Sequence, residues 1–111
     1  QQQSVYRIGA LVVNIPAHTV THHDKPVTLT PTEFRVLEHL LHNANLVLSH
    51  HQLLTAVWGF AYSEATELLK PTISRLRQKI EEDPSHPQLI QTVHGVGYRL
   101  TMMPAGSESH E

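Results

Sequence analysis

The chain has 111 residues, with eight Lys and Arg against ten Asp and Glu, so its formal net charge is −2 with histidine neutral. A chain of this length builds one hydrophobic core, and the absence of cysteine excludes disulfides and thiolate chemistry. Its apolar runs are far shorter than the about 18 residues that a membrane-spanning helix needs, so we expect a soluble protein.

The two ends of the sequence are polar. It opens with QQQS and closes with PAGSESHE, compositions that are typical of linkers and tails. We therefore expect a linker remnant at residues 1–4, one folded domain at residues 5–103 and a flexible tail at residues 104–111.

Short β-branched runs follow the linker, separated by Gly9, Pro16 and the turn-like segment HDKP. Alternating runs of this length with turn residues between them predict an antiparallel sheet. The four strands that we expect are residues 5–8, 11–15, 18–21 and 27–29.

Two capping boxes mark the starts of two helices. Thr30 with Glu33 precedes one apolar pattern and Ser49 with Gln52 precedes another, and Pro31 suits a first helical position. The apolar faces that we expect are Phe34, Leu37, Leu41 and Ala44 in the first helix, and Leu53, Leu54 and Val57 in the second. One turn should connect the two helices.

The segment LLKPTISRLRQKI predicts a third helix. A core-facing stripe follows from the helical repeat of 100° per residue, and it consists of Leu69, Ile73, Leu76 and Ile80. Because proline is tolerated only in the first turn, Pro71 places the helix start near Glu67 or Leu68. Pro84 should end the helix.

The outward face of this helix is a ridge of small and polar residues between positive charges. The ridge consists of Glu67, Pro71, Ser74 and Gln78. Arg75 flanks it on one side, with Lys79 and Thr72 further round, and Lys70 and Arg77 flank the other side. These four cations are half of the eight in the chain, so the layout suits a helix in a DNA major groove. For a basic run taken alone, an ordinary solvated helix face is the more common explanation.

The segment LIQTVHGVGYRLT predicts a terminal hairpin, in which Gly95 and Gly97 supply the positive φ of a tight turn. The fold class is therefore α+β: a winged helix-turn-helix with an N-terminal four-stranded antiparallel sheet, three helices and a C-terminal β-hairpin wing.

Three segments make a resemblance specific: LTPTEFRVLEHLL, VLSHHQLLTAVWG and ISRLRQKIEEDPSHPQLIQTVHGVGYRL. In order and spacing they resemble the C-terminal effector domain of OmpR/PhoB-type two-component response regulators across about residues 5–101. The resemblance implies a cytoplasmic bacterial transcription factor that binds DNA as its effector function, with a receiver domain upstream of this chain.

The resemblance also implies which residues contact DNA. By position, the recognition helix uses Lys70, Pro71, Thr72, Ser74, Arg75, Arg77 and Gln78, and the wing uses Thr92, His94 and Tyr98. Relatives often carry arginine where this chain has Ser74 and His94, which suggests weaker intrinsic binding, a less basic partner surface or reliance on dimers. Head-to-tail pairing on direct-repeat half-sites, from a monomer in solution, is the implied assembly.

The loop between the second and third helices corresponds to an RNA polymerase contact in some relatives. The residues concerned are Phe60, Tyr62 and Glu64, with packing an equal alternative for the two rings. Trp58 is expected in the core. A second hypothesis therefore stays open: a protein interaction module, for RNA polymerase or a receiver, with weak DNA binding.

The ten histidines do not predict a metal site. His22 with His23, and His50 with His51, are adjacent and should point apart, and His39 with His42 lacks carboxylate or cysteine support. No phosphate loop or nucleophile motif is present. We expect no metal, no cofactor and no enzymatic activity.

Overall fold

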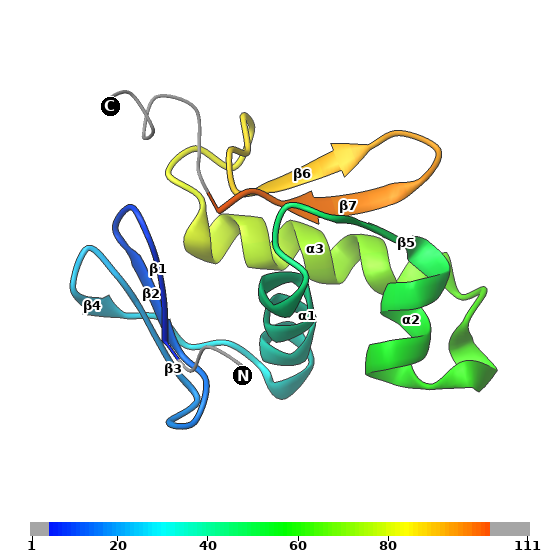
Figure 1. The fold of residues 1–111 in the computed structure, drawn as a ribbon, viewed down its shortest axis with the longest axis horizontal. Helices are drawn as coiled ribbons and strands as arrows, with labels where there is room; N and C mark the ends of the chain where they lie inside the picture. The colour runs from blue at the N-terminus through cyan, green and yellow to red at the C-terminus, as the bar shows by residue number, and fades with distance from the viewer. Residues whose placement is uncertain (1–4, 103–111) are drawn as a thin grey trace.

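The computed structural model describes residues 5–102, so the expectations for residues 1–4 and 104–111 lie outside the described residues. Within this range, a four-stranded sheet, a group of three helices and a three-stranded sheet share one core (Figure 1). The fold is the winged helix-turn-helix that the sequence predicts. None of the helices in residues 5–102 has the length and apolar character needed to cross a membrane.

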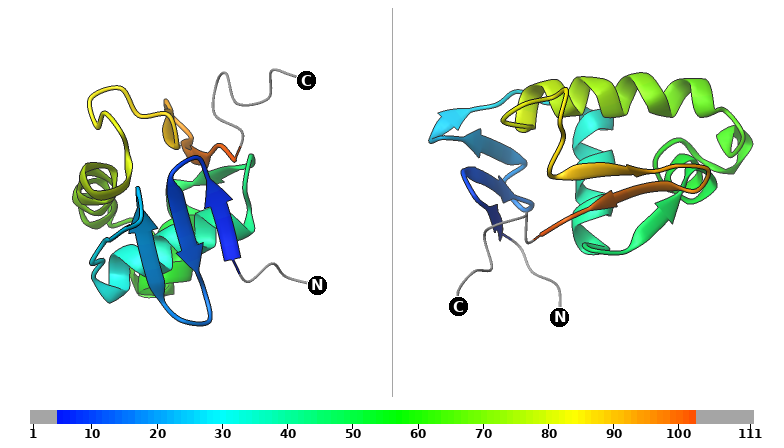
Figure 2. Two further views of the ribbon diagram at one scale, coloured as in Figure 1. Left: turned by 90° about the vertical axis from the view of Figure 1, so that its left-hand side faces the viewer. Right: turned by 90° about the horizontal axis from the view of Figure 1, so that it is seen from above.

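The N-terminal sheet is antiparallel and its strands lie in chain order, as expected. They are β1 (Val5–Ile8), β2 (Leu11–Asn14), β3 (Thr19–His22) and β4 (Lys25–Pro26). In the left view of Figure 2 this sheet stands in front of the first helix, and the third helix is seen end-on beside it.

The fourth strand differs from the prediction. The chain reverses at His23 and Asp24, which both have positive φ, so β4 begins at Lys25 opposite His22. Of the predicted strand 27–29, Val27 still donates its N–H to the Val20 carbonyl at 2.8 Å. An early two-residue turn therefore places the pairing about two residues before the apolar run.

Both capping boxes are confirmed, at the starts of α1 (Pro31–His42) and α2 (His50–Trp58). The Glu33 N–H donates to Thr30 Oγ1 at 3.1 Å, and Glu33 Oε1 accepts the Thr30 N–H at 3.0 Å. The Gln52 N–H donates to Ser49 Oγ at 3.0 Å in the same way. Ala44, predicted on the face of the first helix, lies beyond its end.

The segment between α1 and α2 is more than a turn. It contains β5 (Val47–Ser49), which pairs with β7 (Gly97–Leu100), and β7 pairs with β6 (Ile90–Val93). The sequence does not predict β5, because three residues are too few to show an alternating pattern. The predicted wing is thus anchored to the start of α2.

The two wing glycines have different roles. Gly95 has φ +79°, as predicted for a tight turn. Gly97 has no such φ, and a Cβ there would lie 1.9 Å from the Leu48 carbonyl oxygen. The prediction of positive φ was wrong for Gly97, which allows close approach of β7 to β5.

The third helix, α3 (Thr66–Ile80), begins earlier than predicted, after a short 3-10 turn, η1 (Phe60–Tyr62). Pro71 is therefore inside the helix rather than in its first turn, and the Glu67 carbonyl loses its usual N–H partner. The first turn is tight, with the Leu68 N–H donating to the Ala65 carbonyl at 2.9 Å.

The predicted core stripe of α3 is confirmed. Each of its four residues is at most 1% exposed, and α3 packs against both α1 and α2. The stripe consists of Leu69, Ile73, Leu76 and Ile80. This packing fixes which side of α3 faces solvent.

Candidate nucleic-acid interface

The outward ridge of α3 lies on the surface as predicted, since Glu67, Pro71, Ser74 and Gln78 are all exposed. The β6–β7 hairpin runs alongside α3, and its turn lies toward the N-terminal end of the helix in Figure 1 and in the right view of Figure 2. The helix ridge and the hairpin tip can therefore both contact one ligand.

Thr72 does not belong to this exposed ridge. Its residue is 2% exposed, and its Oγ1 donates to the Leu68 carbonyl at 2.9 Å. The expectation of a DNA contact therefore conflicts with the burial of the side chain. Thr72 lies further round the helix than the ridge, and this side of α3 packs against the core.

A buried carboxylate holds two of the four α3 cations. Glu33, on α1, is 1% exposed, and it pairs with Lys79 Nζ at 2.7 Å and with Arg75 Nε at 3.2 Å. Burial acts to raise the pKa of Glu33, but the hydrogen bond and charge of Lys79, the Thr30 N–H and Arg75 together hold that pKa below its ordinary value. Glu33 therefore stays ionised and orients both cations.

Arg77 joins α3 to the wing. Its Nε and Nη2 donate to the Ile90 carbonyl at 3.0 and 2.8 Å, and Nη2 also donates to Thr92 Oγ1 at 2.9 Å. Its guanidinium carbon lies 5.7 Å from the centre of the Tyr98 ring. Most of its donors are used inside the protein, which a helical projection does not reveal.

Lys70 differs from the other three cations of the helix. It is exposed, and no hydrogen bond or ion pair to it is found within residues 5–102. Arg75 keeps 59% of its side chain exposed despite its pairing. Lys70 and Arg75 are therefore the α3 charges most accessible to a phosphate.

The predicted wing residues divide into tip and base. His94 is exposed within the turn that joins β6 to β7, and Thr92 is exposed beside Arg77. Tyr98 is only 5% exposed, with Arg77 near its ring and His50 packed edge-on at 5.6 Å. Burial raises the Tyr98 pKa while the Arg77 charge opposes this. Tyr98 is part of the packed base, so the expectation that it contacts DNA conflicts with its burial.

The loop between α2 and α3 exposes two aromatic rings. Phe60 is 77% exposed and Tyr62 is 51% exposed, and Glu64 beside them is also exposed. Trp58 packs against the core, as expected. Packing therefore does not account for the Phe60 and Tyr62 rings.

Glu81 has a structural role that the sequence did not predict. It is 5% exposed, and its carboxylate accepts the N–H groups of Gln88, Leu89 and Ile90 at 2.8 to 3.1 Å. The carboxylate thus closes the loop from α3 to β6 and sets where the wing begins. The acidic pair after α3 was visible in the sequence, but nothing local distinguished Glu81 from the exposed Glu82.

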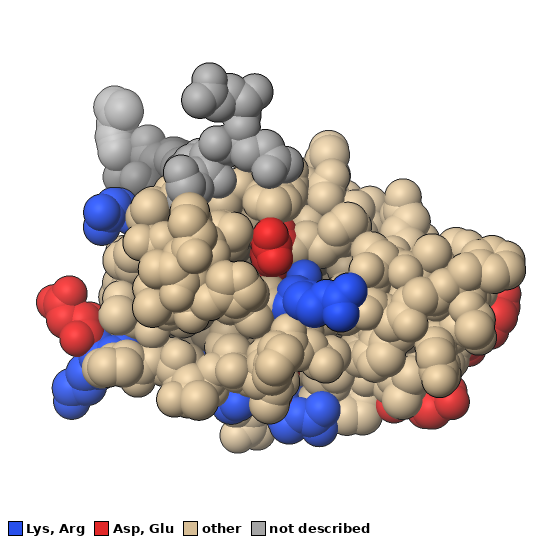
Figure 3. Space-filling view, turned by 90° about the horizontal axis from the view of Figure 1, so that it is seen from below, with Lys and Arg blue, Asp and Glu red and all other residues tan. Residues whose placement is uncertain are grey.

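The charged side chains lie in small separate groups on the surface. Figure 3 shows one face, on which Lys and Arg form separate groups with uncharged surface between them and acidic groups nearby. This pattern agrees with the net charge of −2. Binding to a polyanion would depend on particular side chains rather than on a broad basic field.

The geometry can be compared with known proteins. Residues 24–100 match the family described as transcriptional regulatory protein, C terminal. The DNA-binding response regulator MtrA of Mycolicibacterium smegmatis is 40% identical over 92 residues, which cover 83% of this chain and 40% of MtrA. The chain spans about two fifths of the length of the curated relatives it matches.

Two solved structures are similar in fold. The response regulator DrrB of Thermotoga maritima, an OmpR/PhoB homolog, matches with a TM-score of 0.81 at 32% identity, over 90% of this chain and 45% of that one. The DNA-binding domain of Klebsiella pneumoniae RstA, in complex with RstA box, matches with a TM-score of 0.80 at 25% identity, over 89% of this chain and 98% of that one.

Proposed function

This chain belongs to the C-terminal family of transcriptional regulatory proteins, of the OmpR/PhoB type, and we propose that it reads duplex DNA through α3 and the β6–β7 hairpin. In the full-length protein it would serve as the effector of a two-component response regulator in the cytoplasm, with an upstream receiver domain as its partner.

The observation that carries the proposal is the pairing of an exposed α3 ridge with a hairpin fixed to the same helix. Ser74 and Gln78 face outward, and Arg77 ties the helix to β6 at 2.8 Å. A helix and a wing held in one orientation can follow two adjacent grooves together, without ordering either element on binding.

The exposed side chains divide by chemistry. Gln78 can form paired hydrogen bonds with adenine, and Ser74 can bond to any base edge. Pro71 offers an apolar surface to a thymine methyl group. Lys70 and Arg75 would contact phosphates, which position the helix without reading sequence. His94 would meet the backbone or minor groove beside the site.

Selection of bound sites from a random duplex library tests sequence reading, and the salt dependence of binding tests the phosphate contacts. Lys70→Ala should lower the slope of log affinity against log salt by about 0.9, which is about 3.5-fold in affinity between 50 and 200 mM salt. Gln78→Ala should change the preferred sequence and leave the slope unchanged. Arg7→Ala, an exposed cation on β1, is the matched control.

Failure to enrich any sequence would contradict the proposal. So would equal slopes for the parent, Lys70→Ala and Arg7→Ala, because the charges on α3 would then have no special place in binding. Either result would favour the interaction-module hypothesis.

The proposed assembly on DNA is head-to-tail. A single α3 and wing cover one half-site, so two copies would occupy direct repeats about one helical turn, 10 to 11 base pairs, apart. Sedimentation should show a monomer without DNA and two copies on a repeat. A stable dimer of the free chain at micromolar concentration would refute this arrangement.

The exposed rings of Phe60 and Tyr62 favour a second contact, with RNA polymerase. Large aromatic side chains are enriched where protein surfaces meet, and neither ring is packed into the core. The double variant Phe60→Ala, Tyr62→Ala in the full-length regulator should keep DNA binding and lose activation of transcription. Unchanged transcription would exclude the loop from this role.

A further inference from the structure

A second cluster of functional groups lies at the opposite end of α3 from the wing tip. His22 ends β3, His23 follows it, and Glu82 comes two residues after the end of α3. Glu82 Oε2 lies 3.2 Å from His22 Nε2 and 2.6 Å from His23 Nε2. One potential ligand atom from each residue lies within 4.8 Å of the other two.

The backbone explains why two adjacent histidines converge. On a regular strand neighbouring side chains point to opposite faces, which is why the sequence predicted that these rings would diverge. His23, however, has φ +54° and Asp24 has φ +65° in the turn after β3. The left-handed turn brings the His23 ring beside that of His22, with 4.6 Å between ring centres. The predicted divergence of this pair was wrong.

We propose that His22 Nε2, His23 Nε2 and the Glu82 carboxylate bind a divalent first-row transition metal ion, of which Zn²⁺ fits the ligands best. Two imidazoles and one carboxylate form a known zinc ligand set with a fourth position open to water. On binding, each imidazole would carry its proton on Nδ1 and present the Nε2 lone pair to the ion.

The two distances to Glu82 can be compared with those of a filled site. Zinc–ligand bonds of about 2.0 to 2.1 Å in a tetrahedron separate the ligand atoms by about 3.3 Å. The His22–Glu82 separation of 3.2 Å already matches. The His23–Glu82 pair, at 2.6 Å, must open by about 0.7 Å. The His23 and Glu82 side chains are 60% and 67% exposed, so solvent leaves room for this adjustment, whereas His22, at 17%, is the enclosed member.

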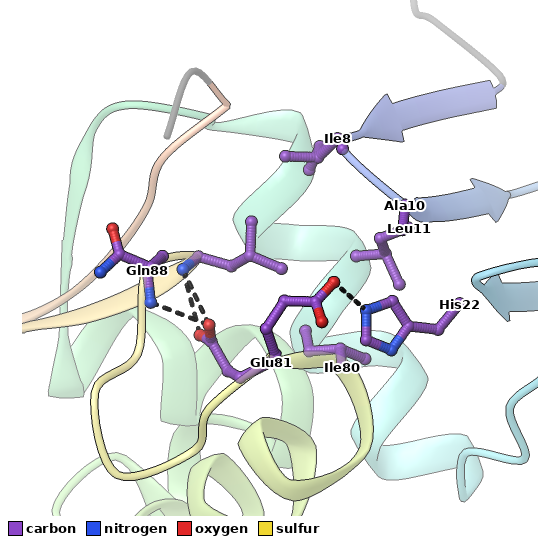
Figure 4. A pocket seen from close by; sticks show the side chains of 10 residues that line it. Ile8, Ala10, Leu11, His22, Ile80, Glu81 and Gln88 are labelled. Atoms are coloured by element: carbon purple, nitrogen blue, oxygen red, sulfur yellow. Dashed lines mark hydrogen bonds and ion pairs between the residues drawn. The ribbon is translucent and has the colours of Figure 1, made fainter. Parts of the chain in front are cut away.

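The surroundings agree with this division between one enclosed ligand and two exposed ligands. His22 lines a cavity of about 250 Å³ between the β1–β2 turn and the end of α3, together with Leu11, Ile80 and Leu89. Figure 4 shows the His22 ring pointing into this cavity, with Glu81 turned away from it toward Gln88. An ion at the rim would join the N-terminal sheet to the end of α3, two segments about sixty residues apart in the chain.

The test is calorimetric titration of Zn²⁺ alone into the chelator-treated chain. We expect one saturable site with a micromolar dissociation constant. Glu82→Gln keeps a hydrogen-bond acceptor but removes the anionic ligand, and it should weaken binding at least tenfold, as should His23→Gln. His51→Gln, an exposed histidine on α2, is the matched control and should bind as the parent does.

A second measurement separates this site from scattered binding to the ten histidines. In ¹H–¹⁵N spectra of the imidazoles, one equivalent of Zn²⁺ should shift the His22 and His23 signals first, and saturating Zn²⁺ should raise the Tm by about 5 °C or more. Equal affinity in parent, Glu82→Gln and His23→Gln, or shifts spread over other rings at one equivalent, would overturn the proposal. Because Glu82 is exposed, its variant should fold, which circular dichroism verifies.

Discussion

Replacing Glu33 by Gln isolates the charge of this residue from its capping role. The Gln carbonyl can still accept the Thr30 N–H, so the start of α1 keeps its cap. The variant loses the charge attraction to Lys79 at 2.7 Å and to Arg75 at 3.2 Å. Hydrogen bonds to charged groups contribute about 1.5 to 3 kcal/mol and exposed ion pairs less than about 1. Since Arg75 is 59% exposed and Lys79 34%, we expect a loss of about 1 to 2.5 kcal/mol in unfolding free energy.

The penalty should depend on pH with a definite sign. The pKa of Glu33 is lower in the folded protein than its ordinary value. The stabilisation is therefore fully present above the ordinary carboxyl pKa, and it is lost as pH falls through the lowered one. The difference between parent and Glu33→Gln should be largest near pH 7 and should shrink below about pH 4, the range where carboxyl groups titrate.

Urea unfolding followed by the fluorescence of Trp58, the single tryptophan, measures both effects. A midpoint about 1 M lower at pH 7 corresponds to the expected loss. DNA binding gives a second readout, because freeing Lys79 and Arg75 should steepen the salt slope by up to about one unit. Glu38→Gln makes the same change in net charge on the same helix and serves as the control.

Two results would refute this reasoning. Equal unfolding midpoints for parent and Glu33→Gln at pH 7 would show that the two ion pairs add nothing to stability. A destabilisation that is independent of pH would assign the loss to packing or to the cap instead.

Further predictions concern the wing and its attachment. Glu81→Gln turns an amide N–H toward three N–H donors, so it should lower the free energy of unfolding by about 2 to 4 kcal/mol, measured by urea unfolding. A loss under about 0.5 kcal/mol would contradict the role of this carboxylate. Gly97→Ala places a Cβ 1.9 Å from a backbone oxygen and should unfold or strongly destabilise the domain. Gly95→Ala has open space around the new Cβ but keeps a positive φ. It should therefore cost only about 1 to 2 kcal/mol of unfolding free energy in the same assay. His94→Arg places a permanent positive charge at the wing tip, so DNA affinity at pH 7.5 should rise by up to about fivefold. An unchanged affinity would place His94 away from DNA.

Local patterns predicted the fold well where the chemistry is local. Thr30 with Glu33, and Ser49 with Gln52, are three residues apart, so their bonds follow directly from the sequence. The apolar stripe of α3 was found for the same reason, because a helix brings its residues together at fixed angles. The β5 strand was not predicted because its pairing with β7 depends on residues that are distant in the sequence.

Distant partners account for most of what the sequence did not show in the candidate site. Glu33 was identified as a capping residue, but its second role depends on cations 42 and 46 residues away. Arg77 was placed correctly on the flank of α3, yet the reach of its side chain to Ile90 could not be known from a projection of one helix. The prediction that the His22 and His23 rings point apart was wrong because a strand pattern does not reveal a left-handed turn at its end.

The link between Arg77 and β6 has an evolutionary consequence. The main hydrogen-bond acceptor of Arg77 is the backbone carbonyl of Ile90. Every amino acid at position 90 would supply this carbonyl. The angle between helix and wing is therefore independent of the outward residues Ser74 and Gln78. In the proposed mode of DNA reading, exchange of those two side chains would give a descendant of this sequence a new operator, while the scaffold that presents them would be inherited unchanged.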